Sequence, residues 1–484
     1  MPGRRFFLVS AAALPLLAHG AYPTPALPAG ALQHDAALLH AILQRLHPGL
    51  HRYASKDAFD SAYRRLLSEA GTAPSMATAY LALSRYLSVI RCGHTYANFF
   101  NQKKGVREAL FSAKNRLPFT FGWVGPRMVV TSGAPGLPRG SEVRGINGVA
   151  SAELLASLLP LVRADGPSDV MKRSLLSVSG SDEIETFDVF FGLLHGAPRF
   201  EIAATLPGGR KADVTLDAID LAQRNANRPK SPTSNAESGP WQFEMLAGGA
   251  GKLTMPGWAL YKEDWNWRAY IARVFDRLAA EHATGLIIDL RNNEGGLDCG
   301  DEIIARLLDR PVRAELWEKQ VRYRALPPEY APYMDTWDDS FRNWGERVEP
   351  VPGRPDFLRF KPTEAEFIIP KGPRFRGRVA VLIDASNHSA TLRFAMLMRE
   401  YKLGKLIGAQ TGGNQSGING GAFFFVRLPQ TGFEVDLPLI GYFSRKPVPD
   451  GGMRPDMLVP TTVADFANAK DRVMQRAIDW LGKT

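Results

Sequence analysis

The sequence predicts an α/β protein whose core is a largely parallel sheet in the C-terminal half of the chain. Two short apolar runs, residues 286–290 and 379–383, have the composition of strands that are buried on both faces. Each run is followed by a polar or Gly-rich turn and then by a helical pattern, so strand and helix alternate along the chain. This order is typical of a parallel sheet covered by helices.

The composition is that of a globular protein with a substantial core. The chain has 484 residues, of which 45% are hydrophobic, and it contains 45 Gly and 35 Pro. This length is enough for about two to four domains that fold without covalent cross-links. Two Cys residues exclude a disulfide-rich scaffold and a cysteine-rich zinc array.

The chain carries a positive net charge that is spread along its length. It has 59 Lys and Arg against 49 Asp and Glu, which gives a formal charge of +10. No long run of Lys and Arg occurs, so the surplus indicates solubility and only weakly a polyanionic partner. We expect no nucleic-acid partner.

Residues 1–20 have the pattern of a signal peptide. Twin arginines at positions 4 and 5 precede an apolar stretch that ends near Leu17, and small residues follow at positions 18 and 20. The stretch is too short to span a bilayer, so we expect no stable membrane insertion. The twin arginines resemble a bacterial twin-arginine export signal, although two basic residues also satisfy the ordinary secretory route. We expect an exported protein, periplasmic or secreted from a bacterial cell.

Residues 21–112 are predicted to form an N-terminal helical domain. Apolar residues recur at helical spacing in three stretches between residues 34 and 101, which indicates helices that pack on a common core. The third stretch ends in the turn Arg91-Cys92-Gly93-His94-Thr95, which carries a histidine.

Residues 113–225 are predicted to form a β module. Short β-like runs at 119–124, 128–130 and 143–146 are separated by Gly and Pro, and Ile146-Asn147-Gly148 is a hairpin signal. A helical run follows from Ala152 to Val162. The polar, Pro-rich stretch 222–240 suits a long loop or a linker, with the linker placed at 226–240.

Residues 241–484 hold the predicted α/β core. A helix is expected from about Ser389 to Tyr401, and Lys405–Gly408 is expected to be a third strand. An aromatic-rich insertion at 311–370 interrupts this region. It is interpreted either as a lid or substrate wall, or as a satellite cluster packed on the core.

One segment, Asp384 to Thr391, lies between a predicted buried strand and a predicted buried helix. This would place Ser389 at a helix N-terminus, where backbone N–H groups favour a developing negative charge. Such a serine can act as a nucleophile, and the N–H of Ala390 can receive the oxyanion. The alternative is that Ser389 only caps the helix, which the segment taken alone favours.

Three further segments are rich in glycine and turn residues. The turn from Asp289 to Gly296 follows a buried strand, and its spacing matches neither a dinucleotide fingerprint nor a phosphate loop. The segment from Thr411 to Asn414 suits a cleft wall or simple turns. The third runs from Pro449 to Asp456.

Taken together, these segments resemble the S41 family of serine peptidases, the tail-specific and tricorn-core-like proteases. Ser389-Ala390 is similar to the family's nucleophile segment, and the turn from Asp289 to Gly296 is similar to its oxyanion turn, which points to Gly296. The segments 408–413 and 452–456 match two further family elements, and the resemblance covers roughly residues 241–465. It implies a ClpP/crotonase-like catalytic core and a degenerate PDZ-like module.

The resemblance also points to a catalytic base. Gly93-His94-Thr95 looks like the family's Asp-Gly-His-Thr turn, although Cys92 replaces the usual Asp. One branch of the family uses a Ser–Lys dyad, which Asn414 excludes here because an amide cannot accept the serine proton. His94 remains as the base, because the unperturbed pKa of a histidine suits proton transfer near neutrality.

Three other residues bear on the assignment of His94 as the base. His388 is ranked below His94 because adjacent side chains diverge at a helix start. Leu392 replaces the family's usual Glu after the nucleophile. Asp450 is the nearest candidate for the carboxylate that orients the imidazole, and a turn aspartate that caps its own backbone is the alternative.

The resemblance implies a serine peptidase that needs no cofactor and no metal and acts on polypeptides. Ser389 would attack, His94 would transfer the proton, and the N–H groups of Gly296 and Ala390 would hold the oxyanion. Residues expected to contact the substrate are Gly295, Gly413 and Asn414. The rival is a non-catalytic protein on the same scaffold that binds a peptide or an apolar ligand, and an esterase is a weaker third option.

The two cysteines suggest a separate hypothesis. If the turns of Cys92 and Cys299 face one cleft, the sulfurs could form a disulfide in an oxidising compartment. Two buried free thiols are the slightly favoured alternative.

Overall fold

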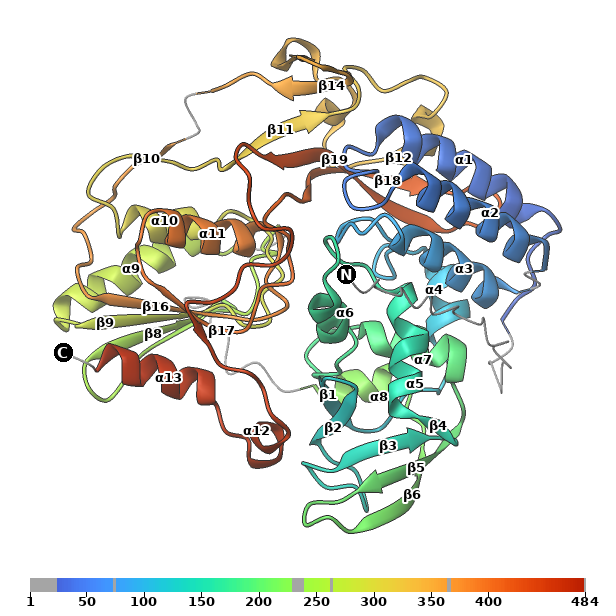
Figure 1. Ribbon diagram of the computed structural model, residues 1–484, viewed down its shortest axis with the longest axis horizontal. Coiled ribbons are helices and arrows are strands. Elements are labelled where there is room, and N and C mark those ends of the chain that lie inside the picture. Colours follow the sequence, from blue (N-terminus) through green and yellow to red (C-terminus); the bar gives the residue numbers. More distant parts are fainter. Residues whose placement is uncertain (1–23, 73–74, 229–238, 262–263, 364–366, 483–484) are drawn as a thin grey trace, which may run out of the picture.

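The computed structural model describes residues 24–72, 75–228, 239–261, 264–363 and 367–482. The predicted signal peptide and most of the predicted linker lie outside these residues. Figure 1 shows an α/β lobe at the left and a second lobe at the right that combines helices above with a small sheet below.

The α/β lobe is built on the predicted sheet. Its six strands lie in the order β20-β17-β16-β9-β8-β7, and all neighbours are parallel except β7 and β8. The predicted buried runs are β9 and β16, and the predicted third strand is β17, so the α/β prediction is confirmed. The strands are β7 (Gln242–Met245), β8 (Ala250–Thr254), β9 (Gly285–Asp289), β16 (Arg378–Ile383), β17 (Lys405–Gly408) and β20 (Met457–Leu458).

Helices cover both faces of this sheet because its central strands are apolar on both sides. Ile288 and Val381 face a core that includes Leu397, while Ile287 and Leu382 face the opposite core. Figure 1 shows α9, α10 and α11 on one face and α13 on the other. The helices of this lobe are α9 (Trp267–Ala280), α10 (Gly300–Ala305), α11 (Ser389–Glu400) and α13 (Arg472–Leu481), whereas α12 (Val463–Asn468) packs on β2 of the other lobe.

The N-terminal region is helical, as predicted. Leu39, Leu43 and Leu46 recur at helical spacing and are fully buried. Ser75 caps the third helix in a reciprocal pair of hydrogen bonds with Thr78. The helices are α1 (Ala31–Leu46), α2 (Lys56–Thr72), α3 (Met76–Ser88) and α4 (Lys104–Phe111).

The β module is an antiparallel sheet with its own helices. Asn147 and Gly148 both have positive φ, 49° and 79°, and they form the predicted tight turn between β3 and β4. The resemblance to a PDZ domain stays a prediction. The strands are β1 (Thr120–Val124), β2 (Arg127–Ser132), β3 (Glu142–Ile146), β4 (Val149–Ala150), β5 (Arg199–Thr205) and β6 (Lys211–Asp217), and the helices are α5 (Ser151–Leu158), η1 (Leu159–Leu161), α6 (Asp169–Leu175), α7 (Thr186–His195) and α8 (Leu221–Ala226).

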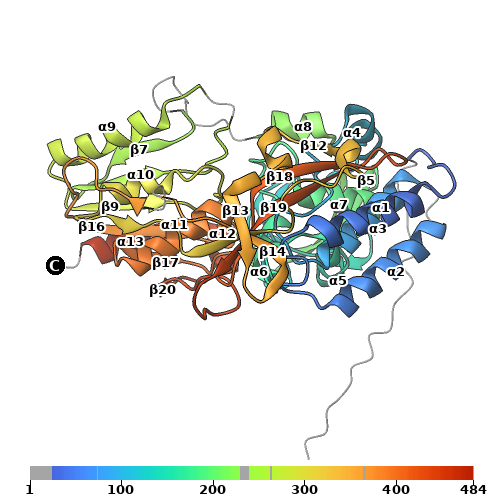
Figure 2. The ribbon, with the colours of Figure 1, turned by 90° about the horizontal axis from the view of Figure 1, so that it is seen from above.

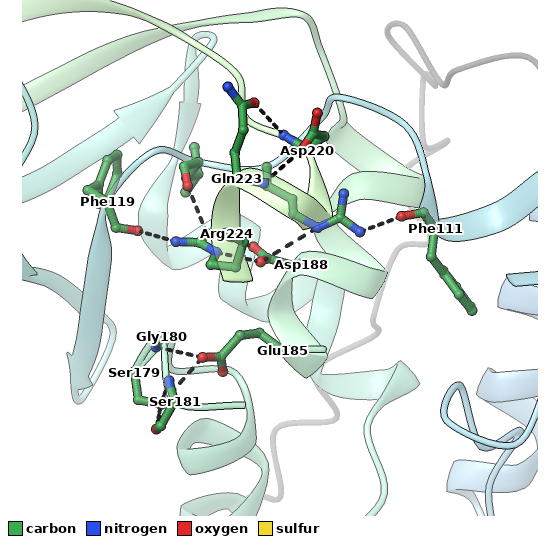
Figure 3. A network of polar contacts seen from close by, with 12 residues as sticks. Phe111, Phe119, Ser179, Gly180, Ser181, Glu185, Asp188, Asp220, Gln223 and Arg224 are labelled. Atoms are coloured by element: carbon green, nitrogen blue, oxygen red, sulfur yellow. Dashed lines mark hydrogen bonds and ion pairs between the residues drawn. The ribbon is translucent and has the colours of Figure 1, made fainter. Parts of the chain in front are cut away.

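The start of the polar stretch 222–240 is not a loop, because α8 occupies residues 221–226. Arg224 on this helix is buried and donates to both carboxylate oxygens of Asp188 on α7, at 2.9 and 3.1 Å (Figure 3). It also donates to the carbonyl of Leu117 at 2.7 Å. This buried ion pair draws the polar segment back onto the β module.

The insertion 311–370 contributes most of a third sheet, and it is neither a separate flap nor a satellite cluster. The antiparallel order is β12-β18-β19-β11-β14-β13, so insertion strands lie on both sides of the β18–β19 hairpin. Figure 1 shows this sheet joining the α/β lobe to the N-terminal helices. The strands are β11 (Trp317–Val321), β12 (Met334–Asp335), β13 (Val348–Val351), β14 (Arg354–Phe360), β18 (Asn419–Arg427) and β19 (Glu434–Ser444).

Short elements complete this part of the chain. The strand β10 (Val312–Arg313) pairs with β15 (Phe367–Ile368), and three 3₁₀ turns cover 331–333, 339–342 and 345–347. Within the described residues, none of the helices combines the length and the apolar character needed to cross a bilayer.

The buried Glu185 of the β module should make the stability of the protein depend on pH. Burial, and then the nearby carboxylates of Asp182 and Asp188, raise the pKa of Glu185 to about 8. Because this pKa is above the ordinary value of 4.5, the stability that Glu185 contributes is fully present below pH 4.5 and is lost as the pH rises through about 8. The Glu185 carboxylate accepts a hydrogen bond from the N–H of Gly180 (Figure 3), which a glutamine can also do.

We expect the Glu185→Gln variant to lose less stability than the wild type between pH 6 and pH 9. Thermal unfolding at the two pH values measures this difference. An equal loss in both proteins would contradict the assignment.

Candidate active site

Ser389 lies at the junction between β16 and α11, in a strained backbone conformation. Its φ is +55°, a region that residues other than glycine rarely adopt. The helix begins at Ser389 and His388 occupies the N-cap position, so Ser389 is not the cap. Within the described residues its partly exposed hydroxyl has no hydrogen-bond partner.

The turn before Ser389 is held by a buried asparagine. Asn387 accepts a hydrogen bond from the N–H of Asp384 at 2.8 Å and donates to the carbonyls of Leu290 and Asn293 at 2.6 and 3.0 Å. These bonds tie the turn after β16 to the turn after β9. Thr391 and Asp384 add further bonds between the same two turns, so the serine and the glycine turn are held together.

The predicted oxyanion turn packs directly against Ser389. A Cβ atom on Gly295 would lie 2.9 Å from the Cβ of Ser389 and 3.0 Å from the nitrogen of Ala390, and the φ of Gly295 is +101°. The backbone N–H groups of Gly296 and Ala390 make no hydrogen bond within the described residues. Two unpaired donors thus stand on the two turns that flank the serine.

The other predicted substrate-contacting residues lie against the same turn. A Cβ on Gly413 would lie 3.0 Å from the Cα of His388. Asn414 is fully buried, and its side chain donates to Asp450 at 2.8 Å and accepts from the N–H of Gly451 at 3.1 Å. Asn414 therefore holds the turn that carries Asp450, and its expected contact with substrate stays a prediction.

The N-terminal histidine reaches the serine turn. His94 packs edge-on against His388, the residue before Ser389, with ring centroids 5.2 Å apart. It also contacts the ring of Phe423 on β18 at 5.9 Å. Residues that are nearly 300 positions apart in the sequence therefore meet at one place.

A carboxylate that the sequence analysis missed lies beside His94. Asp165 is buried, and its Oδ1 accepts the N–H of Gly93 at 2.8 Å. A carboxylate oxygen of Asp165, a ring nitrogen of His94 and the sulfur of Cys92 all lie within 4.8 Å of one another. Asp450 instead bonds to Asn414, and its expected role beside His94 stays a prediction. No motif surrounds Asp165, so the sequence offered no signal for it.

His388 takes part in an ionic chain that crosses the site. Its Nε2 lies 3.3 Å from Oε2 of Glu294, and Arg163 donates to the same oxygen at 3.0 Å. Arg163 also donates to the carbonyl of Gly93 at 2.6 Å. These contacts hold the ring of His388 beside that of His94, and the expectation that its side chain diverges from that of Ser389 stays a prediction.

The electrostatics favour a neutral imidazole beside an ionised glutamate. Burial lowers the pKa of His94 well below its ordinary value, and electrostatic interactions with His388 and Arg163 lower it further. Burial alone would raise the pKa of Glu294, but Arg163 and His388 outweigh it and hold that pKa below its usual range. A neutral His94 can accept a proton.

The two cysteines do not form a disulfide. Both are buried free thiols, and they belong to separate hydrophobic cores. Asn419 donates to the sulfur of Cys92 at 3.3 Å. The alternative of two buried thiols is therefore what the structure contains.

The α/β core carries a strained serine at a strand-to-helix turn, next to a paired-glycine turn. This arrangement is typical of serine hydrolases. The chain matches the model of peptidase family S41 over residues 249–445. It is a serine-type peptidase, and the family implies polypeptide substrates. A search of curated proteins found no match.

Solved structures share the fold over most of the chain. A structure of mature CPAF complexed with lactacystin has a TM-score of 0.62 and 16% sequence identity, and covers 93% of this chain and 98% of that one. A crystal structure of mature CPAF alone has a TM-score of 0.62 and 16% sequence identity, and the match covers 94% of this chain and 96% of that one. At this level of identity the likeness concerns the fold alone.

The contact between Gly295 and Ser389 can be tested with one methyl group. In the Gly295→Ala variant the new Cβ would collide with the Cβ of Ser389, so we expect peptide hydrolysis to fall by roughly a hundredfold or more. Gly105→Ala is the control because the space around Gly105 on α4 is open. Steady-state rates of both variants measure the effect, and equal rates would contradict this placement.

Proposed function

We propose that the protein is an exported peptidase that cleaves peptide bonds through an acyl-enzyme on Ser389, with His94 as the general base. The observation that carries this proposal is the packing of His94 against the residue that precedes Ser389. The free N–H groups of Gly296 and Ala390 support it as oxyanion donors. Export is supported by the pattern of residues 1–20, and it predicts a mature N-terminus near Ala21.

In the proposed reaction, Oγ of Ser389 attacks the carbonyl carbon while His94 accepts the hydroxyl proton. The tetrahedral oxyanion is held by the two backbone N–H groups. Collapse breaks the C–N bond, and the imidazolium returns its proton to the leaving amine. A water molecule then hydrolyses the ester, with His94 again as base.

Asp165 is the proposed positioning residue for His94. Nδ1 of His94 and Oδ2 of Asp165 are both buried, and neither has a hydrogen-bond partner in the structure. A hydrogen bond between these two atoms would fix the tautomer of the imidazole and leave Nε2 free to accept the serine proton. The other carboxylate oxygen is already anchored on the N–H of Gly93.

Two aspartate variants distinguish the candidate carboxylates. We expect Asp165→Asn to lower kcat by roughly 10²–10⁴-fold with little change in KM, because the imidazole loses the group that orients it. Asp450→Asn should lower kcat much less. The reverse order would assign the role to Asp450.

In the same assay Ser389→Ala should keep its fold and lose hydrolysis, and retained hydrolysis would refute the mechanism.

The aromatic side chains beside His94 form a proposed wall of the substrate site. Trp337 is 59% exposed and packs on Phe423, the same ring that contacts His94, and on Phe425. An exposed indole that shares the ring of Phe423 with the proposed base would bury a large apolar side chain of the substrate. The insertion would then be a substrate wall, one of the two roles considered for it.

This wall makes a prediction about specificity. For peptides with a large apolar residue near the scissile bond, Trp337→Ala should lower kcat/KM by roughly tenfold, whereas peptides with Gly there should be unaffected. Tyr261→Ala is the control, because Tyr261 is another exposed aromatic residue in the α/β lobe. An equal effect on both classes of peptide would contradict the role of the wall.

A further inference from the structure

Three side chains that commonly bind metal ions converge next to the proposed base. The sulfur of Cys92, a ring nitrogen of His94 and a carboxylate oxygen of Asp165 lie within 4.8 Å of one another. Nδ1 of His94 and Oδ2 of Asp165 are buried and have no hydrogen-bond partner among the residues that the structure describes. Buried polar atoms without partners are costly, so these two atoms mark a place where a ligand would be stabilised.

The donor set selects the kind of cation. A thiolate, an imidazole and a carboxylate together suit Zn²⁺, whereas Mg²⁺ and Ca²⁺ prefer oxygen ligands alone. Zinc bonds of about 2.0–2.3 Å in a tetrahedral arrangement place ligand atoms roughly 3.3–3.8 Å apart. The three atoms therefore need to approach one another by no more than about 1.5 Å, which is within the reach of side-chain rotation.

Cys92 supplies a sulfur ligand, which favours Zn²⁺ over Mg²⁺ and Ca²⁺. The family turn that it resembles has an aspartate at this position, so the sulfur is a feature of this sequence. Asn419 already donates to Cys92 and would support a thiolate. Two cysteines are too few for a cysteine-rich zinc array, but a mixed site needs only one.

The surrounding charges limit the affinity of such a site. Arg163 lies close to His94 but is paired with Glu294 at 3.0 Å. Arg52 lies close enough to Cys92 and Asp165 to interact with both electrostatically. Two nearby cations weaken the binding of a third, which suits a reversible site better than a permanent structural one.

We propose that Cys92, His94 and Asp165 bind one Zn²⁺ ion, with a fourth position for water, and that this binding reversibly inhibits the peptidase. The Cys92 thiol releases its proton to solvent when the metal binds. Coordination through Nδ1 leaves the remaining imidazole proton on Nε2, the atom that must accept the proton of Ser389. The inhibition depends on the proposed function, whereas the binding does not.

Cobalt(II) provides a readout of binding that does not depend on activity. Titration of the full chain with Co²⁺ should produce a thiolate-to-cobalt charge-transfer absorption that saturates at one equivalent and is displaced by Zn²⁺. Cys92→Ser should abolish this absorption and Asp165→Asn should weaken it. Cys299→Ser is the matched control because Cys299 is the other buried thiol, and its titration should match the wild type.

The rate of peptide hydrolysis by the wild type tests whether Zn²⁺ reversibly inhibits the peptidase. At a zinc concentration ten times the Kd, the rate should fall about tenfold and recover after addition of a chelator. No charge-transfer absorption in the wild type, or an unchanged one in Cys92→Ser, would overturn the site. Metal binding to an active enzyme without inhibition would overturn the regulation. Cobalt binding by a protein that hydrolyses nothing would refute the proposed function and leave the metal site standing.

Discussion

The structure depends on the contact between the His94 turn and the turn that precedes Ser389. The histidine comes from the helical region and the serine from the α/β core, so neither lobe contains the candidate site alone. The β18–β19 hairpin makes the link between them. Asn98 donates to Asp436 on β19 at 2.7 Å, and Gln102 donates to the carbonyl of Glu434 at 2.7 Å. These buried bonds attach the His94 loop to β19, a strand within the residues that match the S41 model.

The two turns on the α/β side are held equally firmly. Ser389 keeps a positive φ because a buried strand precedes it, a buried helix follows it, and Asn387 bonds the turn to its neighbour. Strain of this kind persists only when the surrounding contacts impose it. Its consequence is a hydroxyl without a hydrogen-bond partner in the described residues, next to two unpaired backbone donors. The proposed nucleophile and oxyanion donors are thus held in place before any substrate arrives.

Local patterns predicted the fold elements and the two turns, because each depends on residues that are close in sequence. The strands at 286–290 and 379–383 are buried on both faces and therefore apolar throughout most of their length. Asp165 could not be predicted in the same way, since its place beside His94 depends on how two separate segments pack. Two strands of the insertion were missed for a similar reason: β11 pairs with β19 and β12 pairs with β18, and both partners lie far along the chain.

The central claim is that Ser389 is a nucleophile activated by His94, and reaction with a fluorophosphonate tests it most directly. Mass spectrometry of the intact protein should show one covalent adduct, and peptide mapping should locate it on Ser389. The His94→Ala variant should react far more slowly while keeping its fold. A wild-type protein that stays unlabelled, or carries the adduct on another residue, would contradict the account and favour a binding protein on the same scaffold.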